Sequence, residues 1–163
     1  MANELEAVMN QRQTFLNWLA GFIDGEGTIS ITQRKPQPRY RTYHITMVAF
    51  LSIANTHAET MLFIKTMLDN LYGSSIGCFG KYEGKKRIHK DFYLFTIAKQ
   101  SQLLTILLDL QPFLIMKKTQ AELVIKYLES RQSKPRVKHY GSNYDKTEHA
   151  LRAEVITLNK RGR

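Results

Sequence analysis

The stretch Leu19-Ala20-Gly21-Phe22-Ile23-Asp24-Gly25-Glu26-Gly27 decides how this 163-residue chain is interpreted. Apolar residues at helical spacing begin before it, with Phe15 and Trp18, and continue through it. At 100° per residue these positions cover an arc of roughly 200°, about twice what a helix lying on one core needs. We therefore expect a helix that is either buried on two sides or packed against a second copy of itself. Gly25 and Gly27 are expected to end it.

The same stretch closes with two carboxylates, Asp24 and Glu26. A helix C-terminus carries about −0.5 charge, so each acid there is misplaced by a few tenths of a kcal/mol. A divalent cation would compensate, because Mg²⁺ is usually held by one or two carboxylates together with phosphate oxygens and waters. Two solvated acids in a glycine-rich turn explain the charges equally well, so both alternatives remain open on charge placement alone.

The chain as a whole is strongly basic. It has 24 Lys and Arg against 14 Asp and Glu, a net charge of +10 and a pI near 9.8. Hydrophobic residues make up 43%, which is typical of a globular domain and not of a disordered basic tail. A polyanionic partner is therefore expected, with nucleic acid ahead of a membrane surface.

Other classes of protein are disfavoured by what the sequence lacks. The single cysteine, Cys78, excludes an internal disulfide framework and a zinc site built from cysteines. No apolar run approaches the roughly 18–20 residues that span a bilayer. Residues 1–12 carry Glu4 and Glu6 and look like neither a signal peptide nor a transit peptide. We expect a soluble intracellular protein without a membrane partner.

The remaining sequence predicts a mixture of hairpins and helices. Isoleucines alternating with hydroxyl residues predict a strand over Thr28–Thr32. The other expected elements are strands at 40–53, 76–82 and 92–97, helices at 58–71, 100–110, 118–130 and 148–159, and an irregular segment at 132–145. This order predicts an α+β fold, with helices on one face of a four-stranded sheet. We expect one domain over 1–163, with a core at about 12–130 and a C-terminal extension at 131–163.

The second expected strand has an uneven outer face. Its core-facing parity holds apolar residues, including Met47, Leu51 and Ile53. The opposite parity is polar at Thr42, His44, Thr46 and Ser52, but Val48 and Phe50 interrupt its polarity.

The stretch 19–27 resembles the signature motif of the LAGLIDADG homing endonucleases, which it matches at six of nine positions. The resemblance extends to the order of elements and to Leu-Gln-Pro-Phe-Leu-Ile-Met-Lys-Lys at 110–118, and it thins out after Ser130. It implies an αββαββα saddle, in which a four-stranded antiparallel sheet lines a DNA groove and the helices lie on the opposite face.

The resemblance also assigns roles in metal-assisted phosphodiester hydrolysis. It implies that Glu26 is the metal ligand, joined by the main-chain carbonyl of Gly25, and that Asp24 is a hydrogen-bonding group near the helix end. The implied cofactor is Mg²⁺, with Mn²⁺ or Ca²⁺ able to substitute in binding. Lys117 falls where the family places an active-site lysine, and Asn55 is the expected water-positioning amide.

Base readout is expected on the open face of the sheet. Because side chains alternate along a strand, every second residue after Glu26 in the first strand is expected on this face, and these residues are polar. Polar residues of the next strand are expected beside them. A second basic group suits phosphates better than bases. The first set is Thr28, Ser30, Thr32, Arg34, Arg39, Arg41, His44 and Thr46, and the second is Lys81, Tyr82, Lys85 and Arg87. For each single charge, an ordinary solvated side chain remains an equal alternative.

The motif occurs once, whereas cutting both strands of a duplex needs two acidic sites. A homodimer is therefore expected, with a pseudo-palindromic target of about 20 base pairs. The resemblance implies that the motif helices meet at its centre, through Ala20, Gly21, Asp24 and Gly25.

The leading expectation is a Mg²⁺-dependent, site-specific endodeoxyribonuclease that promotes intron homing and has no small-molecule substrate. Its expected compartment is an organelle whose intron encodes it, or a bacterial cytoplasm. The alternative is a non-cutting nucleic-acid binder on the same fold, either an intron RNA maturase or a transcriptional regulator. Glu26 and Lys117 favour the enzyme, because a pure binder has no need for an acid facing phosphate.

Overall fold

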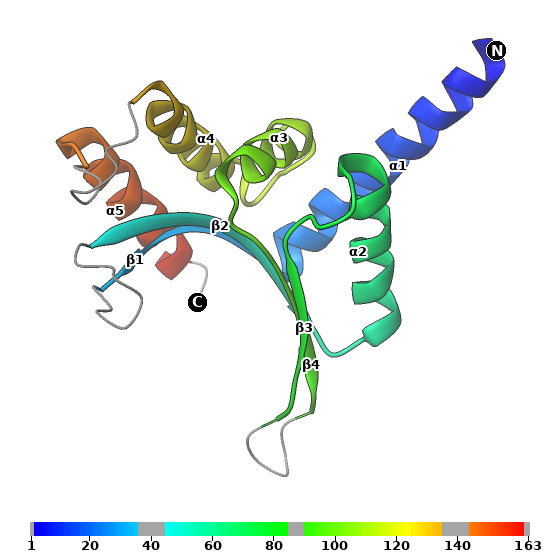
Figure 1. Ribbon diagram of the computed structural model, residues 1–163, viewed down its shortest axis with the longest axis horizontal. Coiled ribbons are helices and arrows are strands. Elements are labelled where there is room, and N and C mark those ends of the chain that lie inside the picture. The colour runs from blue at the N-terminus through cyan, green and yellow to red at the C-terminus, as the bar shows by residue number, and fades with distance from the viewer. Residues whose placement is uncertain (1, 36–44, 85–89, 135–143, 162–163) are drawn as a thin grey trace.

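A computed structural model describes residues 2–35, 45–84, 90–134 and 144–161 of the chain (Figure 1). The order of helices and strands is the expected α-β-β-α-β-β-α-α-α. The elements are α1 (Ala2–Glu26), β1 (Gly27–Arg34), β2 (Thr46–Asn55), α2 (Ala58–Tyr72), β3 (Cys78–Tyr82), β4 (Phe92–Ile97), α3 (Gln100–Leu110), α4 (Lys118–Ser133) and α5 (Lys146–Arg161).

The four strands form one antiparallel sheet in the order β1-β2-β4-β3. The sheet is strongly curved, and helices α1 to α4 lie on its convex side, while α5 runs beside β1 (Figure 1). The α+β saddle expected from the sequence is confirmed.

Alternation along the strands separates the two faces. In β1, Ile29 and Ile31 are fully buried against the helices, while Thr28 is exposed on the concave side. In β2, Leu51 and Ile53 are buried in the same way. Because side chains alternate across a strand, the remaining positions of β1 and β2 face the concave side.

Helix α1 begins at Ala2, well before Phe15, the first residue of the expected apolar pattern. Strand β3 begins at Cys78 and not at 76, because Ser75 (φ 84°) and Gly77 (φ 64°) adopt left-handed conformations that a strand cannot include. A Cβ on Gly77 would lie 2.7 Å from the carbonyl oxygen of Thr96.

The other differences are smaller. The expected strand at 40–53 is described only over Thr46–Asn55, and residues 40–44 lie outside the described ranges. Helix α4 extends three residues beyond the expected end at 130, into the segment expected to be irregular. No helix in the described ranges combines the length and the apolar composition needed to cross a membrane.

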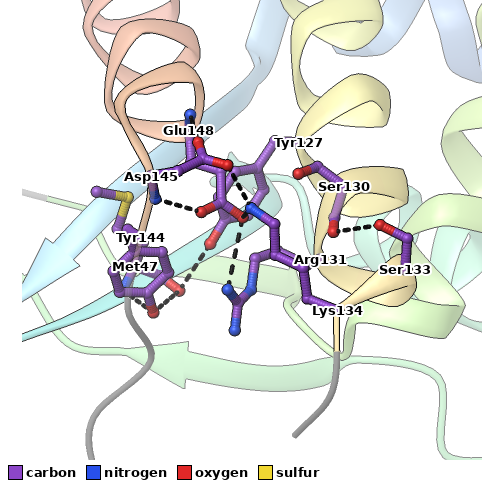
Figure 2. A network of polar contacts seen from close by, with 9 residues as sticks. All are labelled: Met47, Tyr127, Ser130, Arg131, Ser133, Lys134, Tyr144, Asp145 and Glu148. Atoms are coloured by element: carbon purple, nitrogen blue, oxygen red, sulfur yellow. Dashed lines mark hydrogen bonds and ion pairs between the residues drawn. The ribbon is translucent and has the colours of Figure 1, made fainter.

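An ionic network around the buried Glu148 joins α4 to the start of α5 (Figure 2). Glu148, which is 0% exposed, accepts a hydrogen bond from the Asp145 main-chain N–H at 2.9 Å, and Asp145 accepts one from the Glu148 N–H at 2.8 Å. This reciprocal pair is a capping box and explains why α5 begins before the expected residue 148. Lys134, which follows the last residue of α4, and Arg131 of α4 lie 3.1 and 3.5 Å from the Glu148 carboxylate.

The C-terminal helices are also fixed to the sheet. The hydroxyl of Tyr127 donates to the Met47 carbonyl at 3.2 Å, and the Met47 N–H donates to the hydroxyl of Tyr144 at 2.7 Å (Figure 2). At the other end of α5, the Asn159 side-chain amide donates to the Ile29 carbonyl of β1 at 3.0 Å. These contacts support β1 and β2 from behind and so hold the curvature of the concave face.

Candidate functional site

The candidate site begins at the C-terminal end of α1, where Asp24 points into its own chain. Its carboxylate is 9% exposed and accepts three main-chain hydrogen bonds, from the N–H groups of Ile115 (2.8 Å), Met116 (3.1 Å) and Lys117 (2.9 Å). The acid therefore belongs to the fold, and its charge is compensated by the N–H groups just before α4. This agrees with the hydrogen-bonding role that the sequence motif implied for Asp24.

The same contact brings Lys117 to the motif. Its ammonium donates to the Asp24 main-chain carbonyl, so it lies at the negative end of α1. Gly25 and Glu26 follow immediately and are both exposed. The structure therefore gathers three residues that the sequence analysis selected, although Lys117 is about 90 positions away along the chain.

The chain passes from α1 to β1 at a position that only glycine fits. A Cβ on Gly27 would lie 2.8 Å from both the carbonyl oxygen and Cγ2 of Ile23. Gly25, by contrast, is still helical and has open space around it. The expectation that Gly25 ends the helix is therefore wrong: α1 runs through Glu26, and the close approach occurs at Gly27, the first residue of β1.

Asn55 is the last residue of β2 and lies at the end of the sheet where β1 begins. Gly27 pairs with Ile53, so Asn55 is two residues beyond the partner of the first residue of β1. Its side-chain oxygen accepts from the His57 N–H at 2.8 Å, and His57 in turn accepts from the Thr60 N–H and caps α2. The Asn55 oxygen is thus engaged in a turn, and the role of this residue toward water stays a prediction.

The concave face carries a row of small polar groups in the middle of the sheet. The register places Thr28, Ser52, Thr96 and Cys78 side by side across all four strands. The hydroxyls of Ser52 and Thr96 lie 3.2 Å apart, and Cys78 is exposed. Ser30, Thr32, Arg34 and Thr46 continue this face along β1 and β2, as the sequence parity indicated.

The structure describes two members of the second basic group, Lys81 and Tyr82, and they lie on opposite faces of the sheet. Lys81 pairs with Tyr93, which packs against the core, so its side chain leaves the sheet on the helix side and away from the hydroxyl row. Its ammonium is 2.9 Å from Asp91, and this hydrogen bond raises the pKa of Lys81. The expected contact of Lys81 with a phosphate does not require the concave face, and it stays a prediction. Tyr82 does lie on the concave side, stacked on Phe92.

The remaining candidate residues of the DNA face cannot be placed. Arg39, Arg41, His44, Lys85 and Arg87 all lie outside the described residues.

The exposed side of α1 forms an apolar stripe beside the motif. Trp18 is 41% exposed and stacks on Phe22 at 5.4 Å between ring centroids, while Gly21 and Gly25 complete the stripe and have open space at their Cβ positions. Ala20 was expected in the same surface, but it is 0% exposed and packs into the core of its own chain. Like Asp24, it is therefore directed away from the exposed side, which corrects two of the four expected interface residues.

The residues at the end of α1 suit a hard cation only in part. Glu26 and the main chain at Gly25 are exposed oxygen donors, which Mg²⁺ prefers. Within the described residues, however, no group of three or more His, Cys, Asp or Glu side chains gathers in a way that would enclose an ion. The arrangement fits an ion that takes its other ligands from water, phosphate or a second copy of the site.

Comparison with known proteins identifies the family. The family model described as LAGLIDADG endonuclease matches residues 19–111, which include the motif, the whole sheet and α3. The chain belongs to the LAGLIDADG endonuclease family. A curated member, the DNA endonuclease I-CreI of Chlamydomonas reinhardtii, is 34% identical over 119 residues. That match covers 73% of this chain and 65% of I-CreI.

Solved structures of LAGLIDADG endonucleases share the fold. I-CvuI, in a complex with the I-CreI target and Mg, superposes with a TM-score of 0.58 at 20% identity, over 93% of this chain and 81% of that one. The meganuclease I-CpaMI, bound to uncleaved DNA, gives 0.55 at 21% identity, over 72% and 36% of the two chains. At these identities the likeness establishes the fold and no more.

Two parts of the site were missed by the sequence analysis of this LAGLIDADG chain. Thr96 and Cys78 were not selected for the concave face, because their register depends on pairings between strands far apart in sequence. The main-chain donors at 115–117 were also missed, since an N–H group leaves no trace in the sequence. The aliphatic hydroxyl of Thr96, in a strand whose other residues are aromatic or aliphatic, was the one available signal.

Proposed function

We propose that the chain is a homodimeric, Mg²⁺-dependent, site-specific DNA endonuclease that makes double-strand breaks at a long pseudo-palindromic site and so promotes intron homing. One observation carries the proposal: Lys117 donates two hydrogen bonds to Asp24, which hold it at the end of α1, an end close in the chain to the exposed Glu26 and at the start of β1. A cation and an anion are thereby presented together where a duplex lying along the sheet would bring a phosphate.

Each side chain has a distinct task in this reaction. Glu26 supplies a carboxylate that holds the metal, with the Gly25 carbonyl as a second oxygen ligand. Mg²⁺, or Mn²⁺ in its place, supplies an activated water and charge neutralisation at the leaving oxygen when bound. Lys117 places a positive charge where the phosphate gains negative charge, and Asp24 positions Lys117 without touching the substrate.

Two copies are needed because the described residues offer one exposed carboxylate at the end of one motif helix. The stripe of Trp18, Gly21, Phe22 and Gly25 lies next to this carboxylate and is the surface on which we place the partner. Such a contact is isologous, so it would set two Glu26 side chains near the two-fold axis. The glycines let two helices approach closely.

Cleavage of a duplex pool tests the reaction. A randomised duplex library is incubated with the protein and Mg²⁺, and the new ends are sequenced. The wild type is expected to yield one family of pseudo-palindromic sites. Glu26→Gln should abolish cutting and retain binding, whereas Glu129→Gln, a matched change of an exposed acid on α4, should cut normally. Wild-type cutting by Glu26→Gln would refute the assignment of Glu26.

Sedimentation tests the dimer separately. A Cβ at Gly21 meets nothing within 4 Å in the single chain, so Gly21→Ala should fold normally and even gain helix stability. The extra methyl would separate the helices of two copies, so the variant is expected to sediment as a monomer. A wild-type protein that is monomeric at micromolar concentration, with and without DNA, would contradict the dimer.

The same proposal extends to the compartment. Intron homing takes place where the intron-bearing genome is, so the protein is placed in an organelle or in a bacterial cytoplasm. Fractionation of the source cells with an antibody to the chain would locate it.

A further inference from the structure

The concave face holds apolar side chains that the endonuclease chemistry does not use. They are half-buried on β2 and β4, and they do not pack against the core, in contrast to their neighbour Phe79 on the other face. These residues are Val48, Phe50, Phe92 and Leu94. Their presence interrupts a face that is otherwise polar in β1. Phe92 is stacked on Tyr82, while Val48 and Phe50 remain partly exposed.

The apolar side chains lie on both sides of the hydroxyl row. On one side, where β1 and β2 continue beyond β4, Phe50 pairs with Ser30 and Val48 pairs with Thr32. Leu94 pairs with Ala54 and with Gly80, on the opposite side of the row formed by Ser52 and Thr96. Along the strands, the concave face therefore has apolar side chains, then hydroxyl groups, then apolar side chains again.

We infer that Val48 and Phe50 recognise thymine through its 5-methyl group in the major groove of the target duplex. This inference rests on the duplex binding of the proposed function and adds a base preference to it. Of the groups at the major-groove edge, the thymine methyl is the apolar one, while the others donate or accept hydrogen bonds. An apolar side chain set against a donor or acceptor would strip it of water without replacing the bond, which disfavours the other bases.

The charge and the location of the concave face both favour DNA as its partner. The chain carries a net charge of +10, and the exposed Arg34 ends the same concave face, where it can contact phosphate. The face is also continuous with the carboxylate of Glu26, which precedes β1 by one residue. A duplex that reaches Glu26 along the sheet therefore passes over Phe50 and Val48.

The register predicts where the thymines lie. Residues on one face of a strand repeat about every 6.8 Å, close to two base pairs at 3.4 Å each. Ser30, the partner of Phe50, is four residues after Glu26, and Thr32, the partner of Val48, is six. Thymines are thus expected at about four and six base pairs from the bond that Glu26 faces, in both halves of the target.

Uracil substitution tests the inference, since uracil lacks the methyl group and keeps every hydrogen-bonding edge of thymine. Duplexes are selected from the random pool by salt-resistant binding to Glu26→Gln, so that cutting is not required. In the selected duplex each thymine is then replaced by uracil, and Kd is measured. We expect affinity to fall about fourfold for each methyl removed at the two positions. Val48→Ser should lose this discrimination at its own position, because serine has no methyl group, whereas Leu108→Ser, an exposed site on α3, should keep it.

The outcomes separate the two proposals. Equal affinity for thymine and uracil duplexes, selection of no thymine at these positions, or failure to select any sequence would each overturn the methyl recognition. A preference for methylated cytosine over thymine would overturn it as well. Selective binding with the uracil effect but without cleavage by the wild type would support it while refuting the endonuclease.

Discussion

Asp24→Asn replaces a carboxylate that accepts three main-chain hydrogen bonds with a group that has one acceptor oxygen. One carboxylate oxygen accepts from Ile115 and Met116, and the other from Lys117. The amide oxygen can keep the first two as weaker neutral bonds, but the amide NH₂ then faces the Lys117 N–H, donor against donor. A hydrogen bond to a charged group contributes about 1.5–3 kcal/mol, and a buried unpaired donor costs about 1–3 kcal/mol. We therefore expect a loss of about 2–4 kcal/mol in the free energy of unfolding.

Urea and thermal unfolding followed by circular dichroism measure this loss. For a chain of this size the expected fall in Tm is about 4–16 °C. Glu129→Gln is the control, because it removes the same charge from an exposed position on α4. The variant should also lose DNA cleavage at temperatures where it stays folded, because Lys117 is no longer held at the end of α1. A change below about 0.5 kcal/mol, with normal cleavage, would refute the view that Asp24 joins the motif to residues 115–117.

Three further changes test other contacts. Gly27→Ala should destabilise the chain by at least about 1 kcal/mol in urea unfolding, because its Cβ would meet Ile23 at 2.8 Å, and wild-type stability would contradict the close approach. Glu148→Gln should cost about 3 kcal/mol and raise hydrogen exchange in α5, since it leaves Arg131 without its buried partner; unchanged exchange would count against this. Acid should loosen the same helix: a hydrogen bond from Lys134 holds the pKa of Asp145 below its ordinary 3.8, so the stabilisation is complete above that pH and is lost as the pH falls through the lower folded value. Protection factors in α5 should then decline below about pH 4 relative to those in α2, and a parallel decline in both helices would refute a local effect.

Much of the fold was predictable because its signals are local. Alternating isoleucines and hydroxyls in β1, and the apolar spacing of α3, depend on residues a few positions apart, and both elements lie where the sequence indicated. The errors have local causes as well. The sequence at 76–77 continues the apolar pattern of a strand, but left-handed backbone at Ser75 and Gly77 delays β3, and a positive φ at serine has no sequence signal.

The family, the basic charge, and the identity of the acid and the lysine could be inferred before the fold was known, because a long motif and residue types are properties of the chain. The tertiary structure was needed to show which way these groups point. In the folded chain Asp24 and Ala20 are buried, Glu26 and Gly21 are exposed, and Lys81 lies on the helix side of the sheet. Such orientations depend on contacts between residues far apart in sequence, and the energy of those contacts exists only once the chain has folded.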